Sequence, residues 1–294
     1  MTFIKKLRDQ ARQERPERPL ILIDGGDMFK PGQHYQALYG EFFMQALNLM
    51  GYDAFNIGDG ELREGMDVIT AMKQTARFAL ISTNARSSEA AALWQPYRIL
   101  EVHGVRLAVL GAVDPGLMAK TNQTITVEPP RSQVEKQLEA LRGKADIHIL
   151  MAHMSLEKSV DLATQITGLD LVVAGHVSHP VEGQNAGRTL VVSPGKKGEN
   201  IIVADLVWNR RDKKISAIES RLVPLDSSIA GDPAITGLIN TLNVKIENAR
   251  NAQYKRQIRQ KAENKVLIDR SLKMTPEEFL NSYNKEDTEH REAN

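Results

Sequence analysis

The chain has no cysteine in its 294 residues. It therefore forms no disulfide, carries no thiolate nucleophile and cannot bind zinc through sulfur. The absence leaves the compartment open, because exported proteins also do without cysteine. It restricts any metal site to oxygen and nitrogen ligands, such as carboxylates and imidazoles.

Long apolar runs are also missing. No run approaches the roughly 20 residues that a membrane-spanning helix needs. The opening MTFIKKLRDQ lacks the uninterrupted apolar core of a signal peptide. We therefore expect no membrane span, and a cytoplasmic protein from the chain as written. We expect an extracytoplasmic protein if a further segment precedes it.

Neither charge of one sign nor aromatic side chains are abundant. Lysine and arginine number 38 against 37 aspartate and glutamate, so no overall field draws the chain to nucleic acid or to an anionic membrane. Aromatic residues make up 5% of the chain, which is too few to predict a surface for stacking nucleotide bases. Composition therefore excludes nucleic acid as the expected partner and leaves the oligomeric state open.

The apolar residues, 41% of the chain, follow two alternating patterns. Short runs rich in Val, Ile and Leu are typical of buried strands, and apolar residues spaced three and four apart are typical of helices. The expected elements are an opening helix, a strand at 19–24, a helix at 34–50, a strand at 54–57, a helix at 61–76, strands at 78–83, 97–102 and 105–112, a helix at 131–142, a strand at 146–153, a helix at 156–166 and a strand at 169–176. Three strands without helices follow, at 189–194, 200–209 and 213–223, and predict an antiparallel closing portion. The alternation predicts an α/β domain over residues 1–225.

Residues 226–294 are expected to form a helical extension and a polar tail. Asp232 precedes a proline and is a favourable helix start. The apolar stripe of this helix consists of Ile235, Leu238, Ile239, Leu242 and Ile246. The basic stretch 250–265 is typical of a solvent-facing helix, and docking to a partner is the alternative. Thr275 and Glu278 have the spacing of a capping box that begins a last short helix.

Polar side chains that can bind metal ions follow four of the predicted strands. They are Asp27, then Asp59 with Glu61, then His153, and then His176 with His179. Each one alone is commonly a turn former, a helix cap or a hydrogen-bonded histidine. In open α/β sheets, however, ligands bind at the carboxyl ends of the strands. Carboxylate and imidazole ligands together suit Mn, Zn, Fe or Mg.

The order of these motifs resembles the calcineurin-like metallophosphoesterase superfamily, in particular its 5'-nucleotidase branch. The resemblance covers residues 19–205 and implies an α/β/β/α sandwich with mixed sheets. LILIDGGDMFKPG resembles the family's Asp-x-Gly-Asp motif, whose second Asp bridges two metals and is here Asp27. GDGE resembles Gly-Asn-His-Glu, and places Asp59 at a metal-binding Asn. ALISTNA resembles the next strand and ends near Asn84, and MAHMS and GHVSH resemble the last two imidazole motifs.

Three departures from the family pattern fall on the chemistry. No Asp-x-His motif precedes the first strand, so we expect a further segment upstream, because loss of a central strand would expose unpaired backbone. Gly60 stands where the family has a His that assists the leaving group. Ser178 stands at the last imidazole position, with His179 one residue late, and one residue reverses the side-chain direction in a strand.

The resemblance implies a metal-dependent phosphoester hydrolase that binds one divalent ion rather than two. Its metal ligands would be Asp27, Asp59, His153 and His176, with His179 as a further candidate, and His153 and Asp59 would carry catalysis. The substrate would be a small phosphorylated molecule such as a nucleotide. Two alternatives remain: a binding or sensing module that keeps the fold without catalysis, and an interaction protein acting through its C-terminal helices.

Overall fold

The computed structural model describes residues 1–14, 19–29, 34–87, 93–118, 125–275 and 278. Within them the chain forms two compact units, residues 1–240 and residues 241–294. The first helix, α1 (Thr2–Glu14), confirms the helix predicted at the start of the chain.

A three-stranded parallel sheet forms one inner layer of the first unit, in the order β1, β2, β3. Its strands are β1 (Ile23–Asp24), β2 (Ala54–Asn56) and β3 (Ala79–Ile81). The helices that connect them are α2 (Gln36–Met50), α3 (Asp59–Glu64) and α4 (Met66–Thr75). These helices pack their apolar side chains against the sheet, in a cluster that includes Met44, Leu47, Phe55, Ile69 and Leu80.

A six-stranded mixed sheet forms the second inner layer, in the order β10, β11, β9, β8, β6, β5. It is parallel from β11 to β6 and antiparallel at both edges. Its strands are β5 (Tyr97–Val102), β6 (Val105–Val113), β8 (Ile147–His153), β9 (Leu171–Ala174), β10 (Val181–Ala186) and β11 (Thr189–Ser193). Helices α5 (Pro130–Leu141) and α6 (Leu156–Gln165) pack on it.

Smaller elements complete the unit. They are the paired strands β4 (Ala85–Ser87) and β7 (Ile125–Val127), the short helix η1 (Pro115–Met118), and the long antiparallel hairpin of β12 (Asn200–Asn209) and β13 (Lys214–Pro224). Side chains of the hairpin pack with the six-stranded sheet, in a cluster that includes Ile202, Leu206, Trp208, Leu107 and Ile147.

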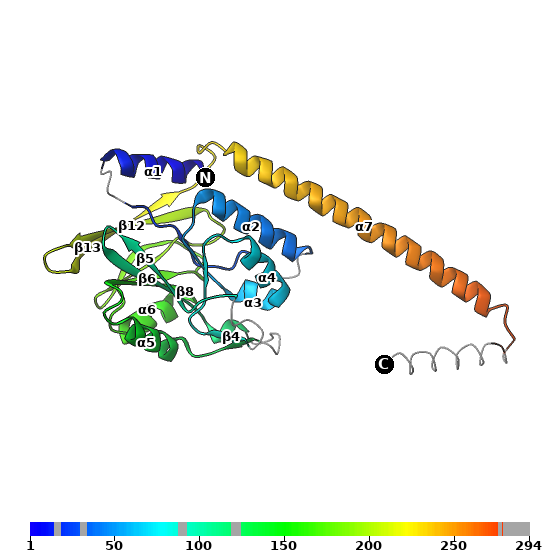
Figure 1. Ribbon diagram of the computed structural model, residues 1–294, viewed down its shortest axis with the longest axis horizontal. Helices are drawn as coiled ribbons and strands as arrows, with labels where there is room; N and C mark the ends of the chain where they lie inside the picture. Colours follow the sequence, from blue (N-terminus) through cyan, green and yellow to red (C-terminus); the bar gives the residue numbers. More distant parts are fainter. Residues whose placement is uncertain (15–18, 30–33, 88–92, 119–124, 276–277, 279–294) are drawn as a thin grey trace. The chain divides into compact units, whose positions relative to one another are not determined.

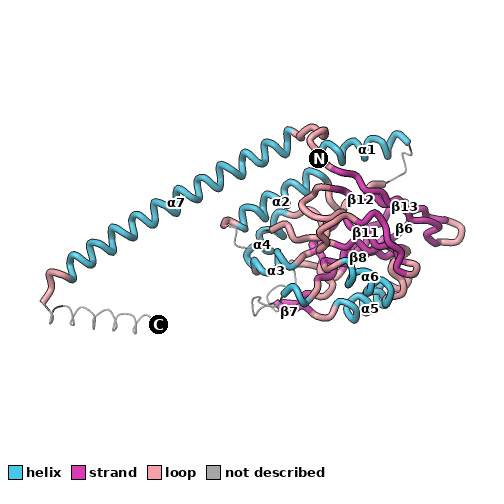
Figure 2. Tube along the Cα trace, turned by 180° about the vertical axis from the view of Figure 1, so that it is seen from behind, coloured by secondary structure: helices cyan, strands magenta, loops and turns pink. Residues whose placement is uncertain are grey.

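The two sheets lie between two layers of helices. Alternation along β6 shows how one strand serves two faces: Leu110 joins the cluster of α5 and α6, whereas Val109 packs with Ala54 and Ile81 of the first sheet. Figure 1 shows α2 and α4 on one side of the strands and α5 and α6 on another, and Figure 2 shows the same grouping from behind. The predicted α/β/β/α sandwich is therefore confirmed.

Several expected elements differ in detail. The single helix expected at 61–76 is two helices, because Gly65 between them has φ +89° and breaks the helical backbone. The strand at 19–24 is reduced to the two residues of β1. The closing portion is not wholly antiparallel, since β11 runs parallel to β9 and antiparallel to β10, which the sequence pattern did not indicate.

The helix expected after Asp232 is confirmed as α7 (Pro233–Ser271). Asp232 Oδ1 accepts the N–H of Ala234 at 2.9 Å, as an N-cap does. Thr275 and Glu278 make the reciprocal capping bonds, but the helix expected after them and the polar tail lie outside the described residues. Among the helices that the structure describes, none combines the length and apolar character required to cross a membrane.

Asn56 connects the two sheets close to their carboxyl ends. Its side chain is fully buried, and its Nδ2 donates to the carbonyl oxygens of Gly25, after β1, and Ala112, in β6, each at 3.3 Å. β6 approaches so closely that a Cβ on Gly111 would lie 2.2 Å from Asn56 Oδ1. Glycine at 111 is therefore a requirement of this contact.

Replacing Gly111 by alanine should lower the free energy of unfolding by about 1–3 kcal/mol, because the added methyl group overlaps Asn56 Oδ1. Combining it with Asn56→Ala should destabilise by less than the sum of the single changes, since the overlap is removed. Urea denaturation followed by circular dichroism measures all three variants. Gly231→Ala, whose added carbon meets nothing within 4 Å, is the matched control, and strict additivity would contradict the assignment.

Candidate metal centre

The loop after β1 directs Asp27 toward the carboxyl ends of the strands. Two consecutive residues have left-handed backbone angles, Gly26 at φ +87° and Asp27 at φ +69°. At Gly26 a side chain is excluded, because a Cβ would lie 2.3 Å from the carbonyl oxygen of Asn56. The loop is further held by a hydrogen bond from the Gly26 N–H to Asp24 Oδ1 at 2.9 Å. Non-glycine residues seldom adopt such angles, so surrounding contacts must hold Asp27 in place.

The fully buried carboxylate of Glu61 provides those contacts. Its Oε2 accepts the N–H groups of Asp27 at 2.9 Å and Gly58 at 2.8 Å, and its Oε1 accepts that of Met28 at 2.7 Å. Burial raises the pKa of Glu61 to about 7 against the lowering effect of these three donors, and the nearby Asp27 charge adds to the rise. The bond from Gly58 holds the start of α3, and the bonds from Asp27 and Met28 hold the loop after β1.

Asp59 and two histidines meet beside this loop. Asp59, the first residue of α3, places its Oδ1 2.9 Å from His153 Nε2 and 3.9 Å from His176 Nδ1. His153 Nε2 is 3.3 Å from His176 Nδ1. Asp59 and His153 are buried, whereas the side chain of His176 is 44% exposed. The group is therefore buried on the side of Asp59 and His153 and open to solvent on the side of His176.

His153 is oriented by a backbone acceptor. Its Nδ1 lies 3.2 Å from the carbonyl oxygen of Gly25, so that Nδ1–H donates there and Nε2 faces Asp59. Burial alone would lower the pKa of His153, but the bond to Asp59 and the charges of Asp27 and Glu61 raise it. Metal-binding histidines commonly have this arrangement, with the second ring nitrogen fixed by a carbonyl.

The pKa of Asp59 is set by burial and by two neighbouring groups, His153 at Oδ1 and Arg63 at Oδ2. Burial would raise its pKa, but the hydrogen bond and charge of His153 and the charge of Arg63 outweigh burial and lower it. Arg63 Nη2 is 3.0 Å from Asp59 Oδ2, and it also donates to the carbonyl oxygen of Leu117. Asp59 is therefore a carboxylate at neutral pH, with a cation at each oxygen when His153 is protonated.

The four groups fit a divalent cation. One ligand atom from each of Asp27, Asp59, His153 and His176 lies within 4.8 Å of the other three. Two oxygen and two nitrogen donors suit Mn, Zn or Fe, and leave room for further ligands on the open side. A cation would also offset the charges of Asp27 and Asp59, and burial raises the pKa of Asp27 in the structure as it stands. The group is therefore a candidate metal centre.

Two other residues singled out from the sequence lie elsewhere. His179 is exposed and its Nδ1 is 3.1 Å from the Ser178 hydroxyl, so it lies outside the group of four. The one-residue shift relative to the family motif turns its side chain away. Asn84 is buried, and its side-chain amide is hydrogen-bonded to backbone groups. Its Nδ2 donates to the carbonyl oxygens of Val113 and Glu128 at 2.8 Å, and its Oδ1 accepts the N–H of Val113.

The space that a proton-donating side chain would need at position 60 is occupied. A Cβ on Gly60 would lie 2.3 Å from Asp27 Oδ1. Neither this contact nor the Arg63–Asp59 ion pair was identified from the sequence. The i, i+4 spacing of Asp59 and Arg63 on a helix was a usable signal for the pair.

Known proteins resemble the chain over most of its length. No family model matches it. The 5'-nucleotidase of Rattus norvegicus is 22% identical over 273 residues, which cover 83% of this chain and 47% of that protein. The chain thus spans about half the length of the curated 5'-nucleotidases that it matches.

Solved structures show the same architecture. The 5'-nucleotidase precursor of Thermus thermophilus superposes with a TM-score of 0.70 at 18% identity, covering 81% of this chain and 52% of that one. The calcineurin-like phosphoesterase YfkN of Bacillus subtilis superposes with a TM-score of 0.70 at 20% identity, covering 85% and 90%. At these identities the likeness establishes the fold alone.

Removing the imidazole of His153 should abolish tight binding of Mn²⁺ or Zn²⁺, because the buried nitrogen donor is lost. We expect the affinity, measured by titration calorimetry, to fall at least about 100-fold, and circular dichroism to report an intact fold. His179→Ala is the matched control and should bind within about twofold of the parent chain. Equal loss in both variants would contradict the geometry. Loss of a residue that only supports a metal ligand already costs about 10- to 100-fold in affinity, and loss of the ligand itself costs at least as much.

Gly60→Ala should weaken metal binding at least about tenfold without lowering the melting temperature by more than a few degrees. Alanine is the better helix former by about 1 kcal/mol, so only the overlap with Asp27 opposes the change. The same substitution at Gly237 in α7, where the added carbon meets nothing within 4 Å, is the control. Unchanged affinity in Gly60→Ala would show that Asp27 moves aside freely.

Proposed function

Because the chain has the metallophosphoesterase fold, we propose that it is a metal-dependent phosphoester hydrolase that uses one divalent ion. The observation that carries the proposal is the convergence of Asp27, Asp59, His153 and His176 at the carboxyl ends of strands from both sheets. Three of these strand ends are held by buried polar contacts, which is how a precise ligand geometry is kept.

The four ligands would act together on the metal ion, and neighbouring groups orient one of them and face the substrate. A divalent ion held by the four ligands would acidify a water molecule and offset negative charge on a phosphoryl group. The Gly25 carbonyl fixes the His153 ring so that Nε2 faces the centre. The half-exposed Arg63 guanidinium lies beside Asp59 and can donate to a phosphoryl oxygen that enters from the open side.

Protonation of the leaving group is the step for which the described residues offer no side chain at position 60. Gly60 cannot donate a proton, and the Asp27 carboxylate fills the adjacent space. General acid catalysis typically contributes about 10²- to 10⁴-fold. We therefore infer that esters of good leaving groups are hydrolysed well, whereas alkyl esters such as nucleotides depend on water as the acid and react slowly.

A small phosphorylated molecule is the substrate that we propose. Relatives of the chain are 5'-nucleotidases, and a nucleotide is accordingly the first candidate, as a substrate that is turned over slowly. The exposed side of the centre, formed by Asp27 and His176, is where such a molecule could reach it.

The competing function is a module that binds metal and ligand without turnover. The specific observation in its favour is again Gly60, since the position that would carry an acid is closed by Asp27 Oδ1. Such a module would bind metal and phosphate with the same residues but would release no product.

With added Mn²⁺, p-nitrophenyl phosphate should be hydrolysed at least about 100-fold faster than AMP, because its leaving group needs no proton. Release of p-nitrophenol and of inorganic phosphate measures the two rates. His153→Ala and chelation with EDTA should each remove both activities. Bound metal with no turnover of either substrate would favour the module, and equal rates for the two substrates would contradict the lack of an acid.

A further inference from the structure

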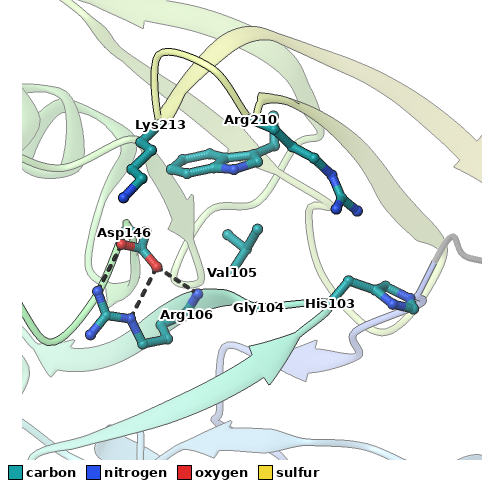
Figure 3. Close-up of a pocket in the computed structure, with 8 residues that line it drawn as sticks. His103, Gly104, Val105, Arg106, Asp146, Arg210 and Lys213 are labelled. Carbon is teal, nitrogen blue, oxygen red and sulfur yellow. Dashed lines mark hydrogen bonds and ion pairs between the residues drawn. The ribbon is translucent and has the colours of Figure 1, made fainter.

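A recess is lined by eight residues from both ends of the β5–β6 and β12–β13 turns and from just before β8 (Figure 3). It has a volume of about 380 Å³, within the range of small-molecule sites. Its walls come from the β5–β6 turn, the residue before β8 and the turn of the β12–β13 hairpin. The lining residues are His103, Gly104, Val105, Arg106, Asp146, Trp208, Arg210 and Lys213.

The recess is remote from the candidate metal centre. Asp146 precedes the first residue of β8 and His153 is its last residue. A strand rises about 3.3 Å per residue, so the two ends of β8 are roughly 23 Å apart. A ligand in the recess therefore has no direct contact with the centre.

One of the three cations in the recess is already paired. Arg106 Nε and Nη2 donate to the two carboxylate oxygens of Asp146 at 3.1 and 2.8 Å, and its Nη1 donates to the Gly143 carbonyl at 2.9 Å. This hydrogen bonding raises the pKa of Arg106 and lowers that of Asp146, so the pair stays ionised. Both carboxylate oxygens of Asp146 are therefore already bonded to Arg106.

The other two cations form no direct pair. In the described part of the chain, no hydrogen bond and no ion pair within 4 Å involves the side chain of Arg210 or Lys213, although the charge of Lys213 helps to lower the pKa of Asp146. Figure 3 shows Lys213 pointing toward Asp146 and Arg210 pointing toward the His103 side. With Arg106 they give three cations against one carboxylate, so the recess favours an anion.

The turn that carries these cations is fixed by its own side chains. Asn209 Nδ2 donates to Asp212 Oδ2 at 2.7 Å, and Asn209 Oδ1 accepts the N–H groups of Arg211 and Asp212 at 2.9 and 3.2 Å. A turn held in this way limits the positions of Arg210 and Lys213 before any ligand binds. Preorganisation of this kind lowers the entropy that binding must overcome.

Trp208 adds a flat apolar surface. It is partly buried, packs with the cluster of Leu107 and Ile147, and also lines the recess. An indole beside Arg210 and Lys213 suits a ligand that combines a planar ring with a phosphate. The recess is also larger than a bare phosphate requires.

We propose that this recess is a second ligand site, which binds a small phosphorylated molecule with a planar ring, of the nucleoside monophosphate class, through Arg210, Lys213 and Trp208. The site is independent of the metal centre and of the hydrolase proposed for it. Turnover at one and binding at the other can therefore succeed or fail separately.

The test uses the full chain with Trp94 replaced by phenylalanine, which leaves Trp208 as the single tryptophan. AMP is added in the presence of EDTA, so that the metal centre does not bind it, and Trp208 fluorescence is followed. We expect a saturable change. Arg210→Ala with Lys213→Ala should weaken binding at least about tenfold, as expected for two lost charged hydrogen bonds.

The matched control removes two cations from the same hairpin that do not line the recess, in Arg211→Ala with Lys214→Ala. It should change the affinity for AMP less than about threefold, as expected for screened surface charge. Equal weakening by both double variants, or no saturable change with AMP, would overturn the site. Inorganic phosphate or a short single-stranded oligonucleotide binding as tightly as AMP would overturn the ring-bearing small molecule. Loss of AMP binding in His153→Ala would show that AMP binds at the metal centre, and this result would also overturn the proposal.

Discussion

The buried carboxylate of Glu61 holds together the two loops on which the candidate metal centre depends. It accepts N–H groups from the turn before α3 and from the strained loop after β1. The backbone segments that carry Asp27 and Asp59 are therefore held by the same carboxylate. Without it, the left-handed backbone at Asp27 would have no compensation. Asn56 extends the same arrangement to the second sheet, and the loop after β1 in turn orients His153 through Gly25.

Charge in the centre is balanced at close range rather than by the chain as a whole. The carboxylates of Asp27 and Asp59 face two imidazoles and one guanidinium, and Glu61 adds a further acid below them. Asp59 Oδ1 and His153 Nε2, now 2.9 Å apart, would both serve as ligands if a divalent ion were bound. Arg63 would then be the cation left facing the open side, where an anionic substrate would approach.

Much of the fold was predictable from the sequence, because buried strands and amphipathic helices leave strong periodic patterns. The strands at 97–102 and 146–153 and the helices at 34–50 and 131–142 all lie where those patterns place them. The exposed, polar strand β10 left no such pattern, and the parallel pairing of β11 depends on β9, which lies outside any local window. The break at Gly65 was not predicted because the flanking helical pattern continues through it.

The candidate site was predictable as residue types at strand ends, since a sheet brings those ends to one edge. The closeness of the four candidate ligands in space could not be read from sequence, whereas the one-residue shift at His179 already indicated that its side chain points elsewhere. The contact between position 60 and Asp27 joins helix α3 to a loop more than thirty residues earlier, and only coordinates reveal it.

That contact decides what a side chain at position 60 could do. Because Asp27 Oδ1 occupies the space above Gly60, a histidine at position 60 would require the Asp27 carboxylate to move. The two side chains therefore compete for one place, and an acid at position 60 could act only in a chain whose Asp27 lies elsewhere.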